Sequence, residues 1–222
     1  QATATLTGVD AYTNAYTIPS VSAFSAALQQ GASLGDAAAL LQTANIGLVK
    51  PEQVKAFEAG YKSVLENGLS IDLNGYYNIY NDFMSTARVI TPMYGEVGTQ
   101  NSYLALINGD RRVFHVYTNT TAEVTSYGFG LGLGKKVYKD FELGASYNHA
   151  QFTFDQAKDP TFIAGFNTPR HRAKASLSND KLFKNFGFNI QARWWSEYEW
   201  QSSFADGTIP STTVLDAQIN YA

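Results

Sequence analysis

Four polar side chains that can hydrogen-bond a solute recur along one segment of the chain. They are Asp72, Asn74, Asn78 and Asp82, all at even positions. Side chains at even positions of an extended strand share one face, so we take these four as candidate substrate-binding residues that line a solute path. The alternative is a hydrated inner wall without a specific site, because the interior of a membrane barrel is polar by default. We favour this second interpretation.

Other chemistries find little support in the sequence. His115, His149 and His171 lie in three separate segments and form no HxH or HxxxH pair, so we predict no metal site. The absence of Cys excludes disulfides and thiol catalysis. No Ser/His/Asp or paired-carboxylate arrangement indicates a catalytic site, and no cofactor is expected. The alternating glycines of residues 128–134 precede no helix pattern, which argues against a nucleotide loop and favours close approach of another backbone.

The segment that carries the four polar residues is a predicted strand. Residues 69–83 read LSIDLNGYYNIYNDF, with apolar residues at most odd positions and polar residues at even ones. This period of two is typical of a strand with one apolar face. The segment is about three times as long as a usual strand of roughly 5 residues. Long two-faced strands joined by tight turns are how a β-barrel crosses a bilayer.

Six further segments show the same pattern. They are residues 53–65, a strand within 113–137, residues 141–152, 170–178 and 186–198, and a strand that begins near 212. The connections alternate between short turns, such as 66–68 and 138–140, and long stretches, such as 85–111 and 153–169. Outer-membrane barrels have short periplasmic turns and longer extracellular loops. We therefore place the loops around Tyr94, Phe162 and Phe204 outside the cell.

Residues 1–50 differ from the rest of the chain. They are rich in Ala and Leu, with predicted helix N-caps at Ser20 and Ser33 and a breaker at Gly31. We expect an extracellular loop with two short helices over residues 1–50, followed by β-barrel strands over 51–222. The chain starts within a predicted loop and stops within a predicted strand, so we expect it to be a fragment.

The composition agrees with a barrel. Of the 222 residues, 45% are hydrophobic, but the mean hydropathy is −0.20 and no run approaches the roughly 18 apolar residues of a membrane helix. Trp194, Trp195, Tyr198 and Trp200 are predicted to form an interfacial aromatic belt, and a sugar-stacking platform is the alternative. The net charge of −3 and the lack of a basic patch argue against nucleic acid. Arg170, His171 and Arg172 can meet lipopolysaccharide phosphates, although a solvated strand start is the simpler interpretation.

One stretch resembles a known family. Residues 47–62, GLVKPEQVKAFEAGYK, and residues 72–83, DLNGYYNIYNDF, are similar to consecutive segments of TonB-dependent outer-membrane receptors. Residues 168–172, 185–187, 194–195 and 211–221 also resemble later strands of that family. The likeness is closest to the large receptors of Bacteroidetes-type bacteria and runs from about Gly47 to Ala222.

The resemblance implies an all-β, transmembrane antiparallel barrel. Such receptors have about 22 strands and a plugged lumen, so seven strands correspond to a C-terminal part of the barrel, without plug, early strands or terminal strand. It also implies that the protein is not an enzyme and that it takes up a scarce solute (siderophore, vitamin, glycan or peptide) across the outer membrane of a Gram-negative bacterium. The expected partners are membrane lipid, lipopolysaccharide and, through the missing plug region, TonB. A surface lipoprotein over the loops stays open.

Two other functions compete with uptake. A passive porin or structural outer-membrane barrel shares the strands and lacks the plug. A soluble β-sandwich adhesin has strands of only about 5 residues, and the length of residues 69–83 argues against it.

Overall fold

A computed structural model describes residues 6–159, 162–202 and 205–221. The chain divides into two compact units. The first, which we call the loop unit, comprises residues up to Gln53, Asp82–Ala122 and Asp155–Ala164. The second, the strand unit, comprises Val54–Asn81, Glu123–Phe154 and Gly165–Ala222. Two segments from the middle of the chain thus join the N-terminal residues in one unit.

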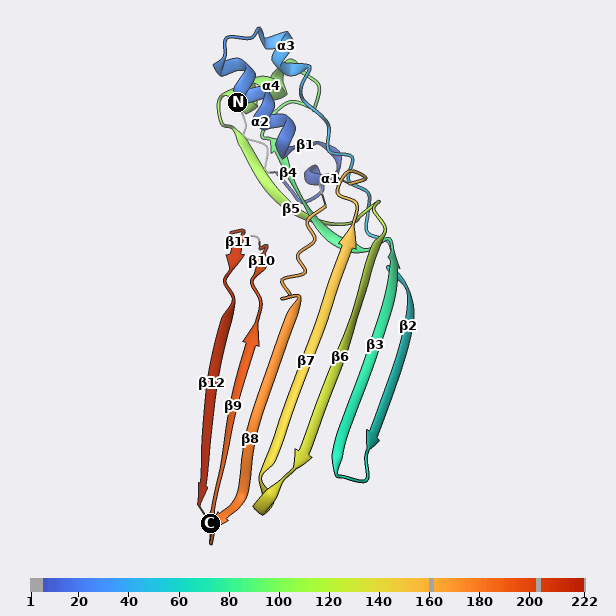
Figure 1. Cartoon of the computed structure of the whole chain (residues 1–222). Helices are drawn as coiled ribbons and strands as arrows, with labels where there is room; N and C mark the ends of the chain where they lie inside the picture. The colour runs from blue at the N-terminus through green and yellow to red at the C-terminus, as the bar shows by residue number, and fades with distance from the viewer. Residues whose placement is uncertain (1–5, 160–161, 203–204, 222) are drawn as a thin grey trace. The chain divides into compact units, whose positions relative to one another are not determined.

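The strand unit is a 7-stranded sheet in the order β12-β9-β8-β7-β6-β3-β2 (Figure 1). The strands are β2 (Gln53–Val64), β3 (Leu69–Asn81), β6 (Val124–Lys136), β7 (Glu142–Phe154), β8 (His171–Phe183), β9 (Phe186–Trp195) and β12 (Thr212–Tyr221). These confirm the seven predicted strands. Sequence neighbours pair, with two exceptions. β3 pairs with β6 across a loop-unit segment, and β9 pairs with β12 across the segment that contains β10 (Tyr198–Trp200) and β11 (Gly207–Ile209).

The two faces of this sheet differ sharply in chemistry. The register aligns Asn74, Gly130, Asn148 and Arg172 in one row of the polar face. The neighbouring row, Leu73, Leu131, Tyr147 and Ala173, belongs to the apolar face. The apolar face lacks a protein cover among the described residues: Leu215 is 75% exposed and Phe57 is 62% exposed. A face of this kind is suited to contact lipid.

Short turns close one end of the strand unit. Gly68 has a φ of 77° in the turn between β2 and β3, and Lys139 and Asp140 have positive φ in the turn before β7. Residues 179–185, expected as a connection, instead extend β8 to Phe183 across a register irregularity. Asn179, 1% exposed, stabilises this irregularity. Its Nδ2 donates to the Lys139 carbonyl (2.7 Å), and its Oδ1 accepts from the Lys181 amide (2.8 Å).

Glycines on the polar face of β6 let neighbouring side chains lie over the strand. A Cβ added at Gly128 would lie 2.4 Å from the His149 carbonyl oxygen and 2.8 Å from the Tyr76 ring. At Gly130 it would lie 2.8 Å from the Asn74 side chain. Side chains of β3 and, at Gly128, a backbone carbonyl of β7 thus lie close over these glycines.

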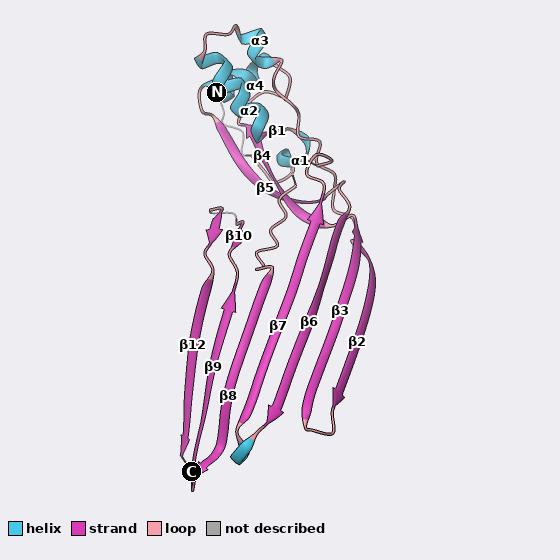
Figure 2. Cartoon of the chain, in the orientation of Figure 1, coloured by secondary structure: helices cyan, strands magenta, loops and turns pink. Residues whose placement is uncertain are grey.

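The loop unit has its own secondary structure (Figure 2). Its helices are α1 (Asp10–Thr13), α2 (Ile18–Gln29), α3 (Leu34–Ala38) and α4 (Gln100–Ile107), and its sheet has the order β1-β4-β5. These strands are β1 (Tyr16–Thr17), β4 (Met84–Pro92) and β5 (Arg111–Asn119). The prediction of a plain connection over residues 85–111 was wrong, because they contain most of β4 and all of α4. Residues 113–137 contain the predicted strand, β6, and also most of β5, which was not predicted. None of the helices described is long and apolar enough to span a membrane.

One of the two predicted helix caps is present. Ser33 caps α3, since its side chain accepts from the Asp36 amide (3.2 Å). The cap at Ser20 was wrong: α2 begins at Ile18 after the N-cap Thr17, and Ser20 lies inside the helix. Pro19 explains the earlier start, because its fixed φ suits the first helical turn.

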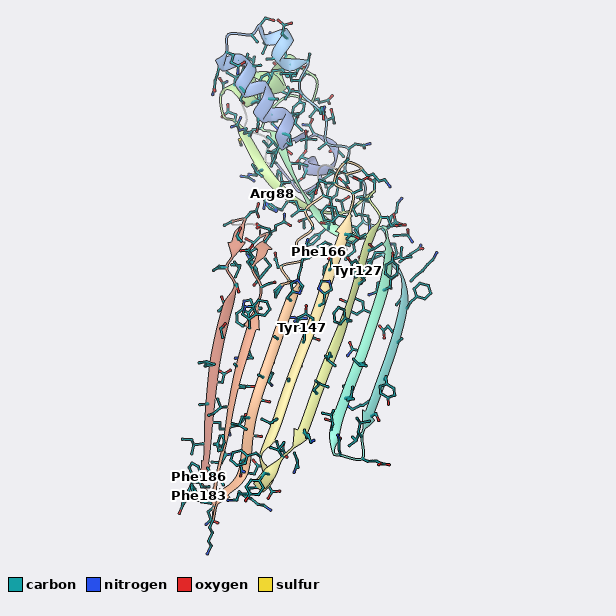
Figure 3. The ribbon with its side chains drawn as sticks, viewed as in Figure 1. Arg88, Tyr127, Tyr147, Phe166, Phe183 and Phe186 are labelled. Atoms are coloured by element: carbon teal, nitrogen blue, oxygen red, sulfur yellow. The ribbon has the colours of Figure 1, made fainter. Side chains whose placement is uncertain are left out.

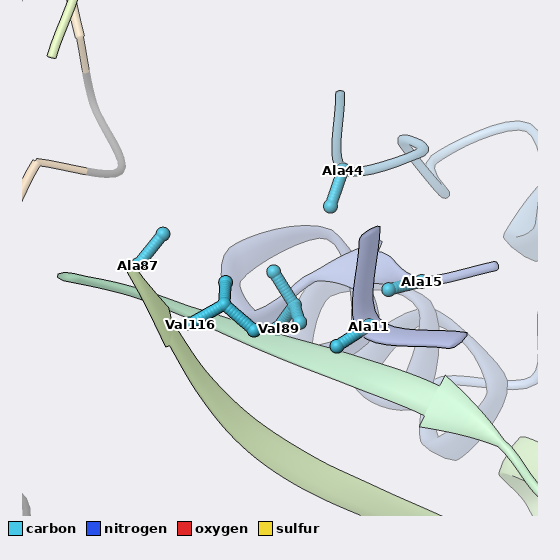
Figure 4. Packing of buried hydrophobic residues seen from close by; sticks show 6 residues of the cluster. All are labelled: Ala11, Ala15, Ala44, Ala87, Val89 and Val116. Atoms are coloured by element: carbon cyan, nitrogen blue, oxygen red, sulfur yellow. The ribbon is translucent and has the colours of Figure 1, made fainter. Parts of the chain in front are cut away.

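Two clusters form the core of the loop unit. Figure 4 shows the first, made of Ala11, Ala15, Ala44, Ala87, Val89 and Val116. The second contains Tyr16, Val21, Phe24, Ala37, Ile90 and Leu106. Tyr16 also joins distant segments, since its hydroxyl accepts from the Gly98 amide (2.6 Å) and hydrogen-bonds the Ser102 hydroxyl (2.7 Å). The loop unit thus has a packed core that ties the N-terminal helices to α4 and β4.

Removal of the Tyr16 hydroxyl is expected to loosen the loop unit. Tyr16→Phe leaves the Gly98 amide unpaired, which costs about 1–3 kcal/mol. In the folded protein, limited proteolysis within the loop unit should accelerate by about tenfold, because cleavage follows local unfolding. Tyr117→Phe, at a 65% exposed position of β5, is the control and should cleave at the wild-type rate. Equal cleavage of all three proteins would contradict this role of Tyr16.

A methyl group at Gly128 is expected to disrupt the sheet, whereas one at Gly75 is not. The added Cβ at Gly128 meets backbone at 2.4 Å, while at Gly75 the nearest atom is the Gly128 carbonyl at 3.7 Å. Overpacking of this kind costs about 1–3 kcal/mol. Gly128→Ala should therefore lower the temperature at which the folded barrel converts to the unfolded form on semi-native gels. Gly75→Ala should match the wild type, and identical behaviour of the two variants would refute the packing argument.

Candidate functional site

The polar face of the strand unit brings three of the four predicted site residues together. Asp72, Asn74 and Asn78 lie on β3 with their side chains on this face. Asp82 does not join them, because β3 ends at Asn81 and Asp82 has a φ of 52° outside the strand. The period of two predicted the shared face correctly but placed the end of the strand at residue 83, two residues beyond Asn81, and so included Asp82.

Asp72 stands beside a shallow depression on this face. Its Oδ2 lies 3.3 Å from Lys62 Nζ of β2. The depression has a volume of about 330 Å³, and its floor includes Gly132 and Gly134 of β6. Lys174 of β8 lines the opposite side. The depression forms because the β6 glycines have no side chains, and the charged groups of Lys62, Asp72 and Lys174 lie around it.

Asn74 and Asn78 are held by their neighbours. Asn74 lies against Gly130, where an added Cβ would collide with its amide. Asn78 Nδ2 donates to the Ser126 hydroxyl (3.2 Å), and its Oδ1 is buried without a hydrogen-bond partner. Such an atom is a candidate acceptor for a group that approaches this face.

The polar face carries additional charge on β8 and β9. Arg193 pairs with Asp216 of β12, at 2.9 Å between Nη2 and Oδ2. Lys174 lies directly opposite Arg193 in the register, and Arg172 is two positions away on the same face. Neither Lys174 nor Arg172 is in an ion pair with another described residue. This wall can therefore hydrogen-bond neutral groups and attract negatively charged ones.

The predicted aromatic belt is not one surface. Trp194 and Trp195 are consecutive on β9, so their side chains lie on opposite faces, and Trp195 shares the polar face with Arg172. Trp194 Nε1 donates to the Ser211 hydroxyl (2.9 Å). Tyr198 and Trp200 belong to β10 (Tyr198–Trp200), which pairs with β11 (Gly207–Ile209) in a separate two-stranded sheet.

Aromatic residues instead gather at both ends of the apolar face (Figure 3). Tyr127 and Tyr147 lie toward one end, and Phe183 and Phe186 lie at the other. At ~3.3 Å per residue, the stretch of β9 from Phe186 to Trp194 is about 26 Å long. A tilt of ~40° reduces this to about 20 Å along the membrane normal, close to the apolar band of an outer-membrane barrel. The sequence missed these groups because their members come from different strands.

The other residues singled out in the sequence are separated. Arg172 lies on the polar face and His171 on the apolar face, so Arg170, His171 and Arg172 form no single patch. Phe162, 6% exposed, packs its ring edge-on to Phe83 at 6.1 Å inside the loop unit. Phe204 lies outside the described residues. The described residues contain no group of three or more His, Cys, Asp or Glu side chains that could hold a metal ion.

The chain is similar in fold to two solved transporters and one solved outer-membrane receptor. The FrpB iron transporter from Neisseria meningitidis matches 78% of this chain with a TM-score of 0.53 and 11% identity. The copper transporter OprC matches 79% with a TM-score of 0.54 and 15% identity. The pyoverdine receptor FpvA from Pseudomonas aeruginosa matches 78% with a TM-score of 0.51 and 13% identity. The match covers 25%, 24% and 24% of those chains, respectively, so this chain spans about a quarter of their length.

A comparison with curated proteins finds no match. The model of the TonB-dependent receptor-like β-barrel family matches residues 9–222, which include the loop unit as well as the strands. The sequence resemblance, the two-faced sheet and this match agree. The chain belongs to the β-barrel family of TonB-dependent receptors, which are receptors and transporters of the Gram-negative outer membrane.

Proposed function

We propose that the complete protein performs TonB-dependent active uptake of a scarce solute across the outer membrane. The observation that carries the proposal is the two-faced, 7-stranded sheet within a chain that matches the receptor barrel family over residues 9–222. Strands β2 and β12 end that sheet. A sheet edge in hydrocarbon needs a hydrogen-bonding partner, so further strands of the receptor are proposed to pair with both and close the barrel.

The solute is proposed to be a siderophore, vitamin, glycan or peptide. The names of the solved relatives describe transport of iron, transport of copper and binding of pyoverdine. At 11–15% identity they support the fold and not a particular solute. The polar wall around Asp72, Asn74 and Asn78 is proposed to face the lumen, where it hydrogen-bonds either the solute or the plug. Asp82 stays a candidate only as part of the loop unit.

The loop unit is proposed to lie on the extracellular side. The chain passes between the two units five times, once after Ala164 in the connection before β8 and four times at strand ends. These strand ends are the start of β2, the end of β3, the start of β6 and the end of β7. Antiparallel pairing puts these four points at one end of the sheet, and the short turns close the other end. Short turns are periplasmic in outer-membrane barrels. TonB is proposed to act through a plug region outside this chain. Lipid and lipopolysaccharide are proposed to contact the apolar face. A surface lipoprotein that covers the loops stays an open question.

A passive porin is the competing function, and ion conductance separates the two. The complete receptor, purified and inserted into a planar lipid bilayer in potassium chloride, should show no steady conductance, because a plug fills its lumen. The same receptor without its plug domain is the positive control and should conduct. Steady conductance of the intact protein, or an upstream reading frame that encodes no plug, would contradict active uptake and favour the porin.

A further inference from the structure

Two histidines from different strands meet on the apolar face of the strand unit. His149 of β7 and His171 of β8 are directly opposite in the register. The Ala150 amide donates to the Arg170 carbonyl (3.0 Å) beside them, which makes them a non-hydrogen-bonded pair. Pairs of this type have their Cα atoms only about 4.5 Å apart, with the side chains closest together. The two imidazole centroids are 4.9 Å apart.

Neighbouring groups orient these rings. Tyr147, two positions before His149, has its hydroxyl 2.6 Å from His171 Nδ1. When Nδ1–H donates to this hydroxyl, the tautomer leaves the lone pair of His171 on Nε2, which is the form that binds metals. The Phe129 ring lies 5.6 Å from the His149 ring on the other side. Both histidines are partly exposed. They lie between the rows of Tyr127 and Tyr147, at the end of the apolar face where aromatic residues gather and water and ions can reach them.

We propose that His149 and His171 together bind one divalent transition-metal ion, with Tyr147 as a positioning residue. Imidazole nitrogen suits Cu²⁺, Ni²⁺ and Zn²⁺ and does not suit Mg²⁺ or Ca²⁺, and Cu²⁺ binds such sites most tightly. Water completes the coordination, because the described residues offer no third His, Cys, Asp or Glu at the site. The ion is therefore exchangeable, and the site lies on the face opposite the proposed solute wall.

The probe is Cu²⁺ alone, titrated into the complete receptor in detergent and followed by calorimetry and electron paramagnetic resonance. The wild type should show a Cu²⁺ signal with two imidazole nitrogens. His149→Gln and His171→Gln should each weaken this binding by about tenfold or more, because two imidazoles held side by side bind one ion more tightly than a single imidazole does. Tyr147→Phe should weaken it by about tenfold and keep both nitrogens, as expected for a group that orients a ligand.

The third histidine supplies the matched control. His115 lies on β5 in the loop unit, so His115→Gln should leave the titration and the spectrum unchanged. An unchanged isotherm and spectrum in both His149→Gln and His171→Gln would overturn the proposal, as would an equal loss in His115→Gln. If either variant fails to fold, carbethoxylation of histidines in the wild type replaces the titration. Cu²⁺ should protect His149 and His171 from modification and leave His115 reactive. Equal modification of His149 and His171 with and without Cu²⁺ would overturn the proposal.

Discussion

The backbone hydrogen bond between strands is the constraint on which this structure depends. In hydrocarbon each unpaired N–H or C=O costs several kcal/mol, so a strand that crosses the membrane must pair over its whole length. The ladder between β3 and β6 runs from Leu69 to Tyr80 without interruption, and the ladder between β6 and β7 runs from Val124 to Lys136. The lengths of the strands, their tight turns at one end and the need for partners at β2 and β12 all follow from this requirement.

Continuous pairing also fixes where each side chain lies. Alternation sends Leu131 and Leu133 to the apolar side and leaves Gly130 and Gly132 on the polar side. The glycines allow Asn74 and Tyr76 to lie over β6, which keeps the inner face closely packed without large side chains on that strand. The same register makes His149 and His171 neighbours. The proposed solute wall and the proposed metal site thus lie on opposite faces of one sheet.

The sequence predicts the strands of the large sheet well, because apolar and polar residues alternate along a strand that has one apolar and one polar face. It fails for β4, where Val89, Ile90, Thr91 and Pro92 are all buried, so the strand has no polar face to produce alternation. Asn179 escapes prediction as well, because its burial depends on the Lys139 turn 40 residues away.

The sites are less predictable than the strands. The alternation of side chains along a strand correctly placed Asp72, Asn74 and Asn78 on one face. The same alternation puts the consecutive residues Trp194 and Trp195 on opposite faces, so they do not form one belt. The contact of His149 with His171 depends on the register of β7 and β8, which a long connection separates and which no spacing in the sequence encodes. Cross-strand neighbours therefore need the structure, whereas same-strand neighbours do not.

The most direct test of the central claim is to measure which environment each face of the sheet contacts. The chain has no Cys, so Ile190→Cys and Gln191→Cys place a single nitroxide label in it on the apolar and polar faces of β9, respectively. In the complete receptor in lipid vesicles, the label at 190 should collide mainly with dissolved oxygen, which concentrates in lipid. The label at 191 should be shielded from lipid and collide relatively more with a water-soluble nickel chelate. Equal access of the nickel chelate to both labels would contradict a lipid-facing wall.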